Sequence, residues 1–505
     1  MKTPDMIKFL LGLKLKKYRF EKGLSLQALS KVSGLSSSYL NEIEKGKKYP
    51  KVDKLLLLAK GLKIKMEDLS GPKIDKTWRP LTDFLESDFY KNFPLETFGM
   101  NRGDLYDLMS HNPQKFSSLI ATFVGLARHY EMEPLEFSKL AFRSYQESKE
   151  NNFPDIERDA DEWRSKLFKD GKVPKVDFLT SFLKKNYRYE ILVLAGKDLP
   201  CWPESGVVYI PKKRPKLIFH ESLDAPHRLF YLAKELGFCV LGLKREEPFD
   251  LSFDRGSFLD RKKELKAFYF ACALLWPKDV YSSELKSLFG KKAFCEKSLL
   301  AILSKGPFLP EIFIQRMAQI IPQSFGLKNL FYLRMEKSPQ SEGDHFKLTD
   351  ELHLSKLHFP HESRLNQHYC RRWASLSSLK EWISEGKGVK PKTSYYGHLK
   401  VQKSRSIDSD QVYFCVSLSS QKMWGGEFKG SPYTVTLGLG IDASLKKNVN
   451  FWKDSSVEEK VVGQTCETCS LRDCSDRVVP SQLNDKKRKR EKEKDGLKDF
   501  CEQHF

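Results

Sequence analysis

Three cysteines close together near the end of the chain carry the clearest chemical signal. Residues 465–480, TCETCSLRDCSDRVVP, place Cys466, Cys469 and Cys474 in the pattern C-x2-C-x4-C. Thiols at this spacing form a disulfide, hold zinc or an iron–sulfur cluster, or lie together by chance. Ten cysteines in the chain are too few for a disulfide scaffold, so their clustering favours metal or redox chemistry. Which alternative applies depends on the rest of the protein.

The length and charge of the chain limit its classes of function. A chain of 505 residues is too long for one core, and we expect about three domains. The 87 Lys and Arg against 66 Asp and Glu give a net charge of +21, which predicts a polyanionic partner such as nucleic acid. The chain has no apolar run long enough to span a membrane and no signal-cleavage pattern. We therefore expect a cytoplasmic protein without a membrane partner.

The first seventy residues predict short helices with a basic surface, because they hold sixteen Lys and Arg against seven Asp and Glu. Gly23 is expected to end the first helix and Ser25 to cap a second. Gly34 can take the left-handed turn that follows. Ser36 is expected to cap a third helix, which ends at Gly46. A short helix, a glycine-containing turn and another short helix are the arrangement of a helix-turn-helix.

Residues 24–50, LSLQALSKVSGLSSSYLNEIEKGKKYP, resemble the Cro/lambda-repressor (XRE) family of DNA-binding proteins. In that family the third helix enters the major groove, so the resemblance implies base or phosphate contacts from this helix and phosphate contacts from the flanking residues. The implied DNA-binding residues are Gln27 in the second helix, Ser36, Ser37, Ser38 and Asn41 in the third, and Lys45, Lys47 and Lys48 after it. Because one such helix recognises a half-site, we expect a homodimer on a DNA operator.

Residues 73–190 predict a helical connecting region without a catalytic constellation. It contains FRSYQESKENNFPDIERDADEWRSKL, which resembles a segment of bacterial short-chain fatty acyl transcriptional regulators.

Residues 191–335 resemble ImmA/IrrE-like proteins, in which an apolar helix carries the zinc motif H-E-x-x-H. The corresponding helix, HRLFYLAKELGFCVLG, has Lys234, Glu235 and Phe238 at the motif positions. Neither lysine nor phenylalanine replaces a zinc-binding imidazole. Glu264 in the next apolar helix stands at the third ligand position. We therefore expect a degenerate ImmA/IrrE-like α+β domain that has no catalytic residues.

The last part of the chain predicts strands and contains the cysteine pattern. We expect a linker at 336–364, a mainly β, cysteine-containing ligand-sensing domain at 365–482, and a charged tail at 483–505. The order C-x-x-W, strands, LGLG-x-D-A and G-x-x-C-x-x-C-x4-C-x-x-R-x-x-P resembles the C-terminal domain of the short-chain fatty acyl regulators. The resemblance implies an acyl-CoA-type effector. Its binding residues stay unknown, although a basic segment at 212–216 is a candidate for CoA phosphates or a solvated loop.

Some members of that family hold an iron–sulfur cluster in this domain. The resemblance therefore implies a 4Fe–4S cluster, because soft thiolates suit iron–sulfur centres. The implied ligands are Cys466, Cys469 and Cys474, with Cys370 as the fourth. Cys415 is a reserve, although its strand position favours a core thiol. Zinc in the same thiolates and free thiols or a disulfide are the alternatives.

These observations predict a multidomain α+β fold. Its parts are an N-terminal all-α helix-turn-helix domain at 1–72, a helical middle with a small ImmA/IrrE-like α+β domain, and the mainly β C-terminal domain. The predicted function is a non-enzymatic transcriptional regulator that binds DNA sequence-specifically and senses an acyl-CoA-type metabolite. The alternatives are an ImmA/IrrE-type metallopeptidase that acts on a repressor and a regulator that senses only redox or iron. The operator, the sign of regulation and the acyl group are not predicted.

Overall fold

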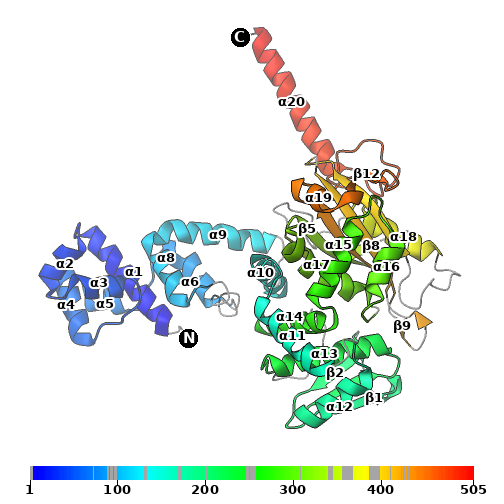
Figure 1. The fold of residues 1–505 in the computed structure, drawn as a ribbon. Coiled ribbons are helices and arrows are strands. Elements are labelled where there is room, and N and C mark those ends of the chain that lie inside the picture. Colours follow the sequence, from blue (N-terminus) through cyan, green and yellow to red (C-terminus); the bar gives the residue numbers. More distant parts are fainter. Residues whose placement is uncertain are drawn as a thin grey trace. The chain divides into compact units, whose positions relative to one another are not determined.

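Figure 1 shows the computed structural model of the chain. The residues that it does not describe are 1–3, 72, 88–89, 91–94, 96–98, 130–133, 169–172, 200–201, 204, 246–248, 251–257, 308, 339–344, 355–367, 386–397, 410, 422, 425–426, 429–430 and 505. The chain forms two compact units. Unit 1 holds Met1–Tyr145 with Ser257–Leu259, and unit 2 holds Gln146–Gly256 with Asp260–Phe505.

Five helices open unit 1 and share one apolar core. They are α1 (Pro4–Glu21), α2 (Leu26–Ser33), α3 (Ser37–Glu44), α4 (Val52–Leu62) and α5 (Met66–Ser70). Leu15, Leu29, Leu40 and Leu58 enter this core from four different helices, and each is at most 1% exposed. Helices of eight residues are marginal alone, so this burial, about 1.5–3 kcal/mol for each leucine, holds them together. The expected all-α N-terminal domain is confirmed.

A second apolar face of α1 extends unit 1 beyond residue 72, where we expected a domain boundary. On this face Phe9 and Leu13 pack in a cluster with Trp78 and Tyr106. The elements that complete the unit are η1 (Lys76–Trp78), α6 (Arg79–Glu86), α8 (Arg102–His111), α9 (Pro113–His129) and α10 (Pro134–Ser148). The unit continues past the expected boundary because α1 buries one face on α3 and the other against residues of η1, α6 and α8.

Unit 2 begins with helices and a small mixed sheet. The elements are α11 (Pro154–Leu167), α12 (Val176–Tyr187), β1 (Glu190–Leu194), η3 (Gly196–Asp198), β2 (Val207–Ile210), β3 (Lys216–His220), α13 (Ala225–Val240) and β4 (Phe249–Asp250). The strand order is β1-β3-β2-β4, in which β1 and β3 are parallel and the other neighbours are antiparallel. The α+β class is confirmed for the chain, whereas the likeness of this region to ImmA/IrrE stays a prediction.

Four helices follow the small sheet and lead to a larger one. They are α14 (Phe258–Leu275), α15 (Lys278–Phe289), α16 (Glu296–Leu303) and α17 (Pro310–Phe325). The helix α17 packs against the rest of unit 2 through an apolar face, whose residues Phe313, Ile314, Met317 and Ile321 are all buried.

A six-stranded sheet dominates the rest of unit 2. Its strands are β5 (Leu330–Lys337), β6 (Phe346–His353), β7 (His398–Ser406), β8 (Val412–Ser420), β11 (Tyr433–Gly440) and β12 (Glu459–Val462). They lie in the order β12-β7-β8-β11-β5-β6, and every pair is antiparallel except β12 with β7. The sheet therefore begins before residue 365, and β6 lies within 336–364, where we expected a linker. The difference arises because β5 and β6 pair as a hairpin across residues 339–344, which the structure does not describe.

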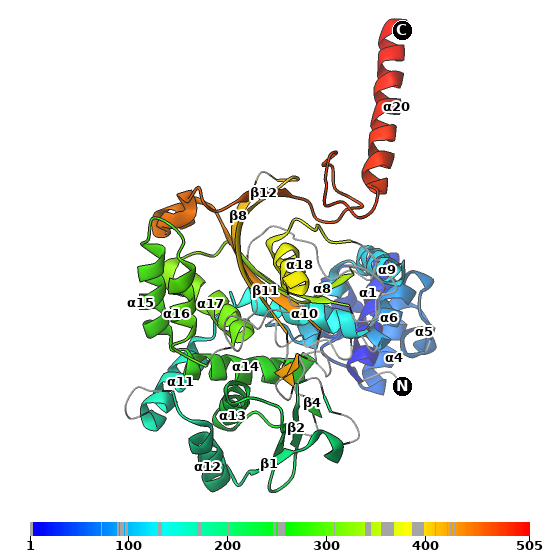
Figure 2. The same cartoon turned by 90° about the vertical axis from the view of Figure 1, so that its right-hand side faces the viewer.

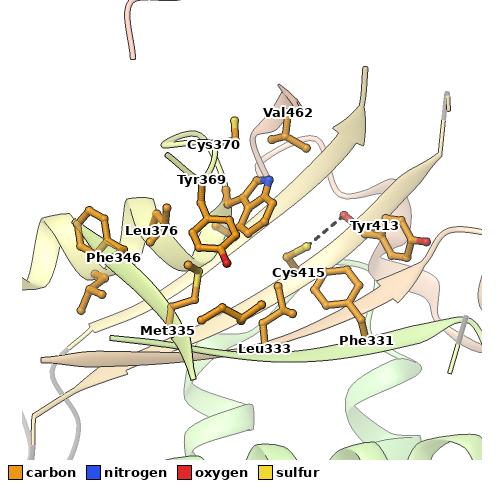
Figure 3. Close-up of a cluster of buried hydrophobic side chains, with 14 of the residues drawn as sticks. Phe331, Leu333, Met335, Phe346, Tyr369, Cys370, Leu376, Tyr413, Cys415 and Val462 are labelled. Atoms are coloured by element: carbon orange, nitrogen blue, oxygen red, sulfur yellow. Dashed lines mark hydrogen bonds between the residues drawn. The ribbon is translucent and has the colours of Figure 1, made fainter. Parts of the chain in front are cut away.

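Helices cover both faces of this sheet. Figure 2 shows α15–α17 on one side of β8 and β11, and α18 (Ala374–Glu385) on the other. Under α18 the buried side chains form one cluster, drawn in Figure 3, which includes Leu333 and Met335 of β5 and Leu376 of α18. The short strands β9 (Met423–Trp424) and β10 (Glu427–Phe428) form a separate antiparallel pair.

A buried ion pair ties the start of unit 2 to α17. Arg316 is fully buried and donates to Glu157 Oε1 at 2.6 Å and to Oε2 at 3.0 Å. The hydroxyl of Tyr269 donates to the same Glu157 Oε1 at 2.7 Å, and Arg316 Nε donates to the carbonyl of Trp276 at 2.9 Å. The arrangement satisfies both buried charges and links α11, α14 and α17.

The chain ends with three further helices. They are α19 (Ala443–Asn448), η4 (Asn450–Lys453) and α20 (Gln482–His504), and the last corresponds to the expected charged tail. In the described part of the chain, no helix combines the length and the apolar character that a membrane crossing needs.

Candidate functional site

The turn between α2 and α3 is built by three residues that act locally. The Ser25 side chain accepts a hydrogen bond from the Ala28 backbone N–H at 3.0 Å and so caps α2. Gly34 ends α2 with φ at 71°, a left-handed conformation that costs other residues free energy. Ser36 caps α3 in the same way through the Tyr39 N–H at 3.3 Å. All three predicted roles are confirmed.

α1 holds α3 by close packing and by a buried ion pair. At Gly12 a Cβ atom would lie 2.3 Å from the carbonyl oxygen of Ile43, so α1 approaches α3 this closely only with glycine. Arg19 donates to both carboxylate oxygens of Glu44, at 2.6 and 2.8 Å, and both residues are buried. Arg19 also donates to the carbonyl of Leu24 at 2.9 Å, at the start of the α2 segment. These contacts with α1 therefore fix the orientation of α3 on the side that faces the core.

The outer face of α3 carries short polar side chains. Ser38 and Asn41 are exposed, and Ser37 is partly exposed. Ser38 and Asn41 lie three positions apart, and Ser37 and Asn41 lie four apart, so they share one helix face. Their hydroxyls and amide offer donors and acceptors that suit base edges and phosphates. Ser36 is exposed, but its oxygen already accepts the capping hydrogen bond.

The three predicted lysines have different surroundings. Lys45 forms an ion pair with Asp107 of α8 at 3.3 Å, and Lys48 forms one with Glu42 at 2.8 Å. Lys47 is exposed, and the part of the chain that the structure describes offers it no carboxylate within ion-pair distance. Lys47 is thus the most available of the three for a phosphate. The partner of Lys45 is 62 positions away, so no sequence pattern indicates it.

An aromatic residue that the sequence analysis did not single out belongs to the same surface. The ammonium groups of Lys48 and Lys54 lie over the Tyr39 ring, 5.9 and 4.5 Å from its centroid. Both contacts are within cation–π range. Lys54 therefore adds a positive charge beside the start of α3. The tyrosine three residues after the Ser36 cap was visible in the sequence, but its lysine partners were not.

Gln27 is exposed in the first turn of α2, whereas its neighbour Leu26 packs against the core. The side chain of Gln27 is thus available at the helix N-terminus, where backbone N–H groups attract anions. The structure brings all eight predicted DNA-binding residues into the same small domain.

The N-terminal residues match a known family. Residues 15–69 match the family model HTH_3, described as "Helix-turn-helix". These residues form a helix-turn-helix domain. Such a domain supports DNA binding in the regulation of transcription.

Solved structures give weaker similarities. A "Mycobacterium tuberculosis transcriptional regulator" is 16% identical over 67% of this chain and 92% of its own, with a TM-score of 0.47. The restriction-modification controller protein C.AhdI from Aeromonas hydrophila is 36% identical over 13% of this chain and 98% of its own, with a TM-score of 0.12. The competence regulator ComR from Streptococcus vestibularis is 16% identical over 59% and 91%, with a TM-score of 0.13. Because each TM-score is below 0.5, none carries a conclusion about the whole fold. The search of curated proteins gives no match.

Backbone pairing brings the distant Cys370 to the C-terminal cysteines. Cys370 N–H donates to the carbonyl of Gln464 at 3.0 Å, and Cys466 N–H donates to the carbonyl of His368 at 2.8 Å. Cys469 lies next to Gly463, because a Cβ atom built on that glycine would be 2.8 Å from Cys469 Sγ. Three of the four predicted metal ligands thus share one pair of loops, and each is at most 8% exposed.

The tryptophan and arginine of the motif hold these loops. Trp373 Nε1 donates to the carbonyl of Gly463 at 2.8 Å. Arg477 Nη1 donates to the carbonyl of Cys466 at 2.9 Å, and its Nη2 donates to that of Cys469 at 3.4 Å. These hydrogen bonds give the C-x-x-W and C-x-x-R parts of the pattern a structural role.

The cysteines fit a thiophilic centre in chemistry but do not converge in space. Among the described residues, no group of three or more His, Cys, Asp or Glu side chains is arranged to hold a metal ion. Burial raises the pKa of the Cys370 thiol to about 11, so a metal would have to displace its proton. Cys415 lies in β8, buried in the cluster of Figure 3, and donates to the carbonyl of Tyr413.

The two carboxylates at the predicted zinc-motif positions are held by cations. Lys234 Nζ lies 2.5 Å from Glu264 Oε2, with both side chains largely buried. Arg245 donates to both oxygens of the fully buried Glu235, and the Tyr189 hydroxyl donates to Glu235 Oε2 at 3.0 Å. A carboxylate held this way is a poor base for water. The sequence shows which residues stand on this helix, but it did not predict the ion pair with Arg245, because the approach of Arg245 depends on the fold.

Proposed function

We propose that this chain is a cytoplasmic, sequence-specific DNA-binding transcriptional regulator that acts as a homodimer and senses a short-chain acyl-CoA-type metabolite. The observation that carries the DNA-binding part is the exposed polar face of α3, supported from behind by the buried Arg19–Glu44 pair. The basic residues around it supply phosphate contacts, which position a protein on the duplex.

The first experiment selects duplexes from a random pool with the full-length protein and then measures affinity by fluorescence anisotropy. We expect one enriched sequence with two related half-sites. Affinity should fall steeply as salt rises, because each phosphate contact releases counterions. A protein that enriches no sequence, or whose binding is insensitive to salt, contradicts the proposal.

Homodimerisation is tested on the selected site. A dimer places two α3 helices about one DNA turn, roughly 34 Å, apart. Insertion of five base pairs between the half-sites rotates one by half a turn and should weaken binding strongly, whereas insertion of ten should restore part of it. Equal affinity for all three spacings would indicate that a single copy binds.

The effector is tested by thermal unfolding with acetyl-, propionyl- and butyryl-CoA. A ligand that binds the folded state raises its melting temperature. A shift with one acyl-CoA supports metabolite sensing. No shift with any of them favours the alternative regulator that senses only redox or iron.

The C-terminal cysteines support an iron–sulfur cluster, or alternatively zinc, as part of the proposal. What supports it is the thiol donor set and the pairing that brings Cys370 beside Cys466 and Cys469. Anaerobically purified protein is analysed for iron and zinc and for visible absorption. Cys469→Ser should lower the metal content, while Cys239→Ser, on the distant helix α13, should not. Equal metal content in both variants argues against the site.

A non-enzymatic role is supported by the ion pairs at Glu235 and Glu264. A metallopeptidase needs three protein ligands and a carboxylate that is free to activate water. Peptidase activity on a repressor that Glu235→Gln abolishes would overturn this part of the proposal.

A further inference from the structure

A basic cavity lies at one end of the six-stranded sheet. It has a volume of about 670 Å³ and is open to solvent. Its lining includes the end of β8, the loop before β5, residues that follow β11, and η4. The residues that matter here are Asn329, Lys403, Arg405, Lys446, Trp452 and Lys453. This volume is in the range of small-molecule sites.

The four cations of the cavity fall into two groups. Arg405 is paired with Glu459 of β12 at 2.7 Å, and Lys403 Nζ donates to the Asp454 carbonyl at 2.5 Å. These two cations already have partners in the protein. Lys446 and Lys453 have no carboxylate partner among the described residues, and their ammonium groups lie 5.2 and 5.3 Å from the centroid of the Trp452 ring.

Two unpaired ammonium groups beside a half-buried indole suit a ligand that carries both phosphate and a planar ring. An exposed cation–π contact is weaker than a charge-assisted hydrogen bond to phosphate. A phosphate would therefore draw Lys446 and Lys453 from the ring. The exposed face of Trp452 would then be free to stack on a base, as aromatic side chains do in nucleotide sites.

Asn329 lines the cavity and lies against Gly440. The asparagine fits there because position 440 is glycine, since a Cβ at Gly440 would lie 2.1 Å from Asn329 Nδ2. Gly440 N–H also donates to the Asn329 carbonyl at 2.7 Å. Asn329 and Gly440 therefore shape this part of the wall together.

We propose that this cavity binds a small nucleotide, with its phosphates at Lys446 and Lys453 and its base on Trp452. The inference gives a function to the LGLG-x-D-A motif, whose last glycine makes room for Asn329 and whose aspartate caps α19 through Leu445 N–H at 2.9 Å. It goes beyond the proposed function, because it assigns a site and holds for a nucleotide without any acyl group.

The test is isothermal titration of the full-length protein with ADP, 3′,5′-ADP, adenosine and inorganic phosphate. We expect saturable binding of one nucleotide per chain. Adenosine and phosphate alone should each bind at least tenfold more weakly. Nucleotide affinity should fall at high salt, because salt screens the contacts between lysine and phosphate. Nucleotide affinity should fall at least tenfold in Lys446→Ala/Lys453→Ala and in Trp452→Ala. Trp452→Phe, which keeps an aromatic ring, should restore most of it.

The matched control is Lys447→Ala, which removes an exposed lysine from the same helix but not from the cavity. Circular dichroism of each variant checks its fold. Absence of nucleotide binding, or equal affinity in Lys447→Ala and the double variant, overturns the proposal. Inorganic phosphate that binds as tightly as the nucleotides would mark a simple anion site instead. Tight binding of single-stranded DNA that the same variants abolish would mark a nucleic-acid contact, and it too overturns the proposal. Failure of DNA-operator binding has no bearing on this result.

Discussion

Asn41 and Lys47 belong to one small domain but are expected to contribute to DNA binding in different ways. Asn41 is exposed on the outer face of α3, where an amide can pair with a base edge. Lys47 follows the helix and carries only a point charge, which suits a phosphate. The distinction between base recognition and phosphate contact therefore depends on single residues and is best tested there.

Replacement of Asn41 by alanine is expected to weaken binding to the selected operator by about 1–3 kcal/mol, because it removes a base contact. Non-specific binding to unrelated DNA should change little, since phosphate contacts remain. Anisotropy titrations with both duplexes give the ratio of the affinity for the operator to the affinity for unrelated DNA. Asn186→Ala, an exposed asparagine of α12 in unit 2, is the matched control. An equal loss for operator and unrelated DNA would show that Asn41 does not contact bases.

Replacement of Lys47 by alanine is expected to weaken binding to all sequences alike and to reduce the slope of log affinity against log salt by about 1. Lys45→Ala should have a smaller effect, because Lys45 is engaged by Asp107. Anisotropy titrations between 50 and 200 mM salt, roughly the range in which phosphate contacts matter most, give the slopes. A larger change for Lys45→Ala would mean that its ion pair opens on DNA.

At the scale of elements, the caps and the turn decide how α3 is presented. The backbone N–H groups at the starts of α2 and α3 donate to Ser25 and Ser36, and Gly34 turns the chain between the two helices. The core leucines then hold α2 and α3 together. The glycine of the turn is needed for its backbone conformation, because its φ is positive and a Cβ there would touch nothing within 4 Å.

A pair of glycines isolates this conformational effect. A Cβ at Gly34 or at Gly125 in α9 would meet nothing within 4 Å, but only Gly34 has a positive φ. Gly34→Ala should therefore destabilise unit 1 by about 1–2 kcal/mol, whereas Gly125→Ala should stabilise it by about 0.5–1 kcal/mol, because alanine is the better helix former. Urea unfolding followed by circular dichroism compares them. Changes of the same sign would contradict the explanation.

At the scale of the whole molecule, buried ion pairs join segments that are far apart in the chain. Glu157 and Arg316 lie 159 positions apart and connect α11 with α17. Burial by itself would raise the pKa of Glu157, but its hydrogen bonds with Arg316 and the charge of that residue bring the pKa below its ordinary value. The pair therefore stabilises unit 2 only while the carboxyl is ionised.

Glu157→Gln is expected to destabilise unit 2 at neutral pH by about 3–5 kcal/mol, since it leaves the charge of Arg316 buried without its carboxylate. The shift of the urea midpoint measures this. Glu162→Gln on the same helix, whose exposed carboxylate pairs with Lys166, should leave the midpoint nearly unchanged. Equal shifts for both variants would mean that burial does not matter here.

The same pair gives unit 2 a pH dependence. Because the folded pKa of Glu157 is lowered, the contribution is complete above the unfolded pKa of about 4.3 and is lost as the pH falls through the folded value. The midpoints of the wild type and Glu157→Gln should therefore converge as the pH is lowered below about 4. A gap that stays constant from pH 7 to pH 3 would contradict this assignment.

The sequence by itself determined the local features of this protein. The serine caps and the left-handed Gly34 depend on residues within one or two helical turns, so spacing predicted them, whereas the resemblance to the XRE family implied the polar face of α3. The absence of histidine at positions 234 and 238 was equally plain, because a ligand type is a property of the residue. Family resemblance added the expected effector and cluster, which stay predictions.

Only the tertiary structure decided which distant residues meet. Cys370 reaches Gln464 and Cys466 because two loops pair by backbone hydrogen bonds, and no spacing encodes that pairing. The engagement of Glu235 by Arg245 and the basic cavity beside Trp452 arise in the same way. The physical reason is that a strand's partners and a cavity's walls depend on how apolar faces are buried together, whereas a cap or a turn depends on its own neighbours in the chain.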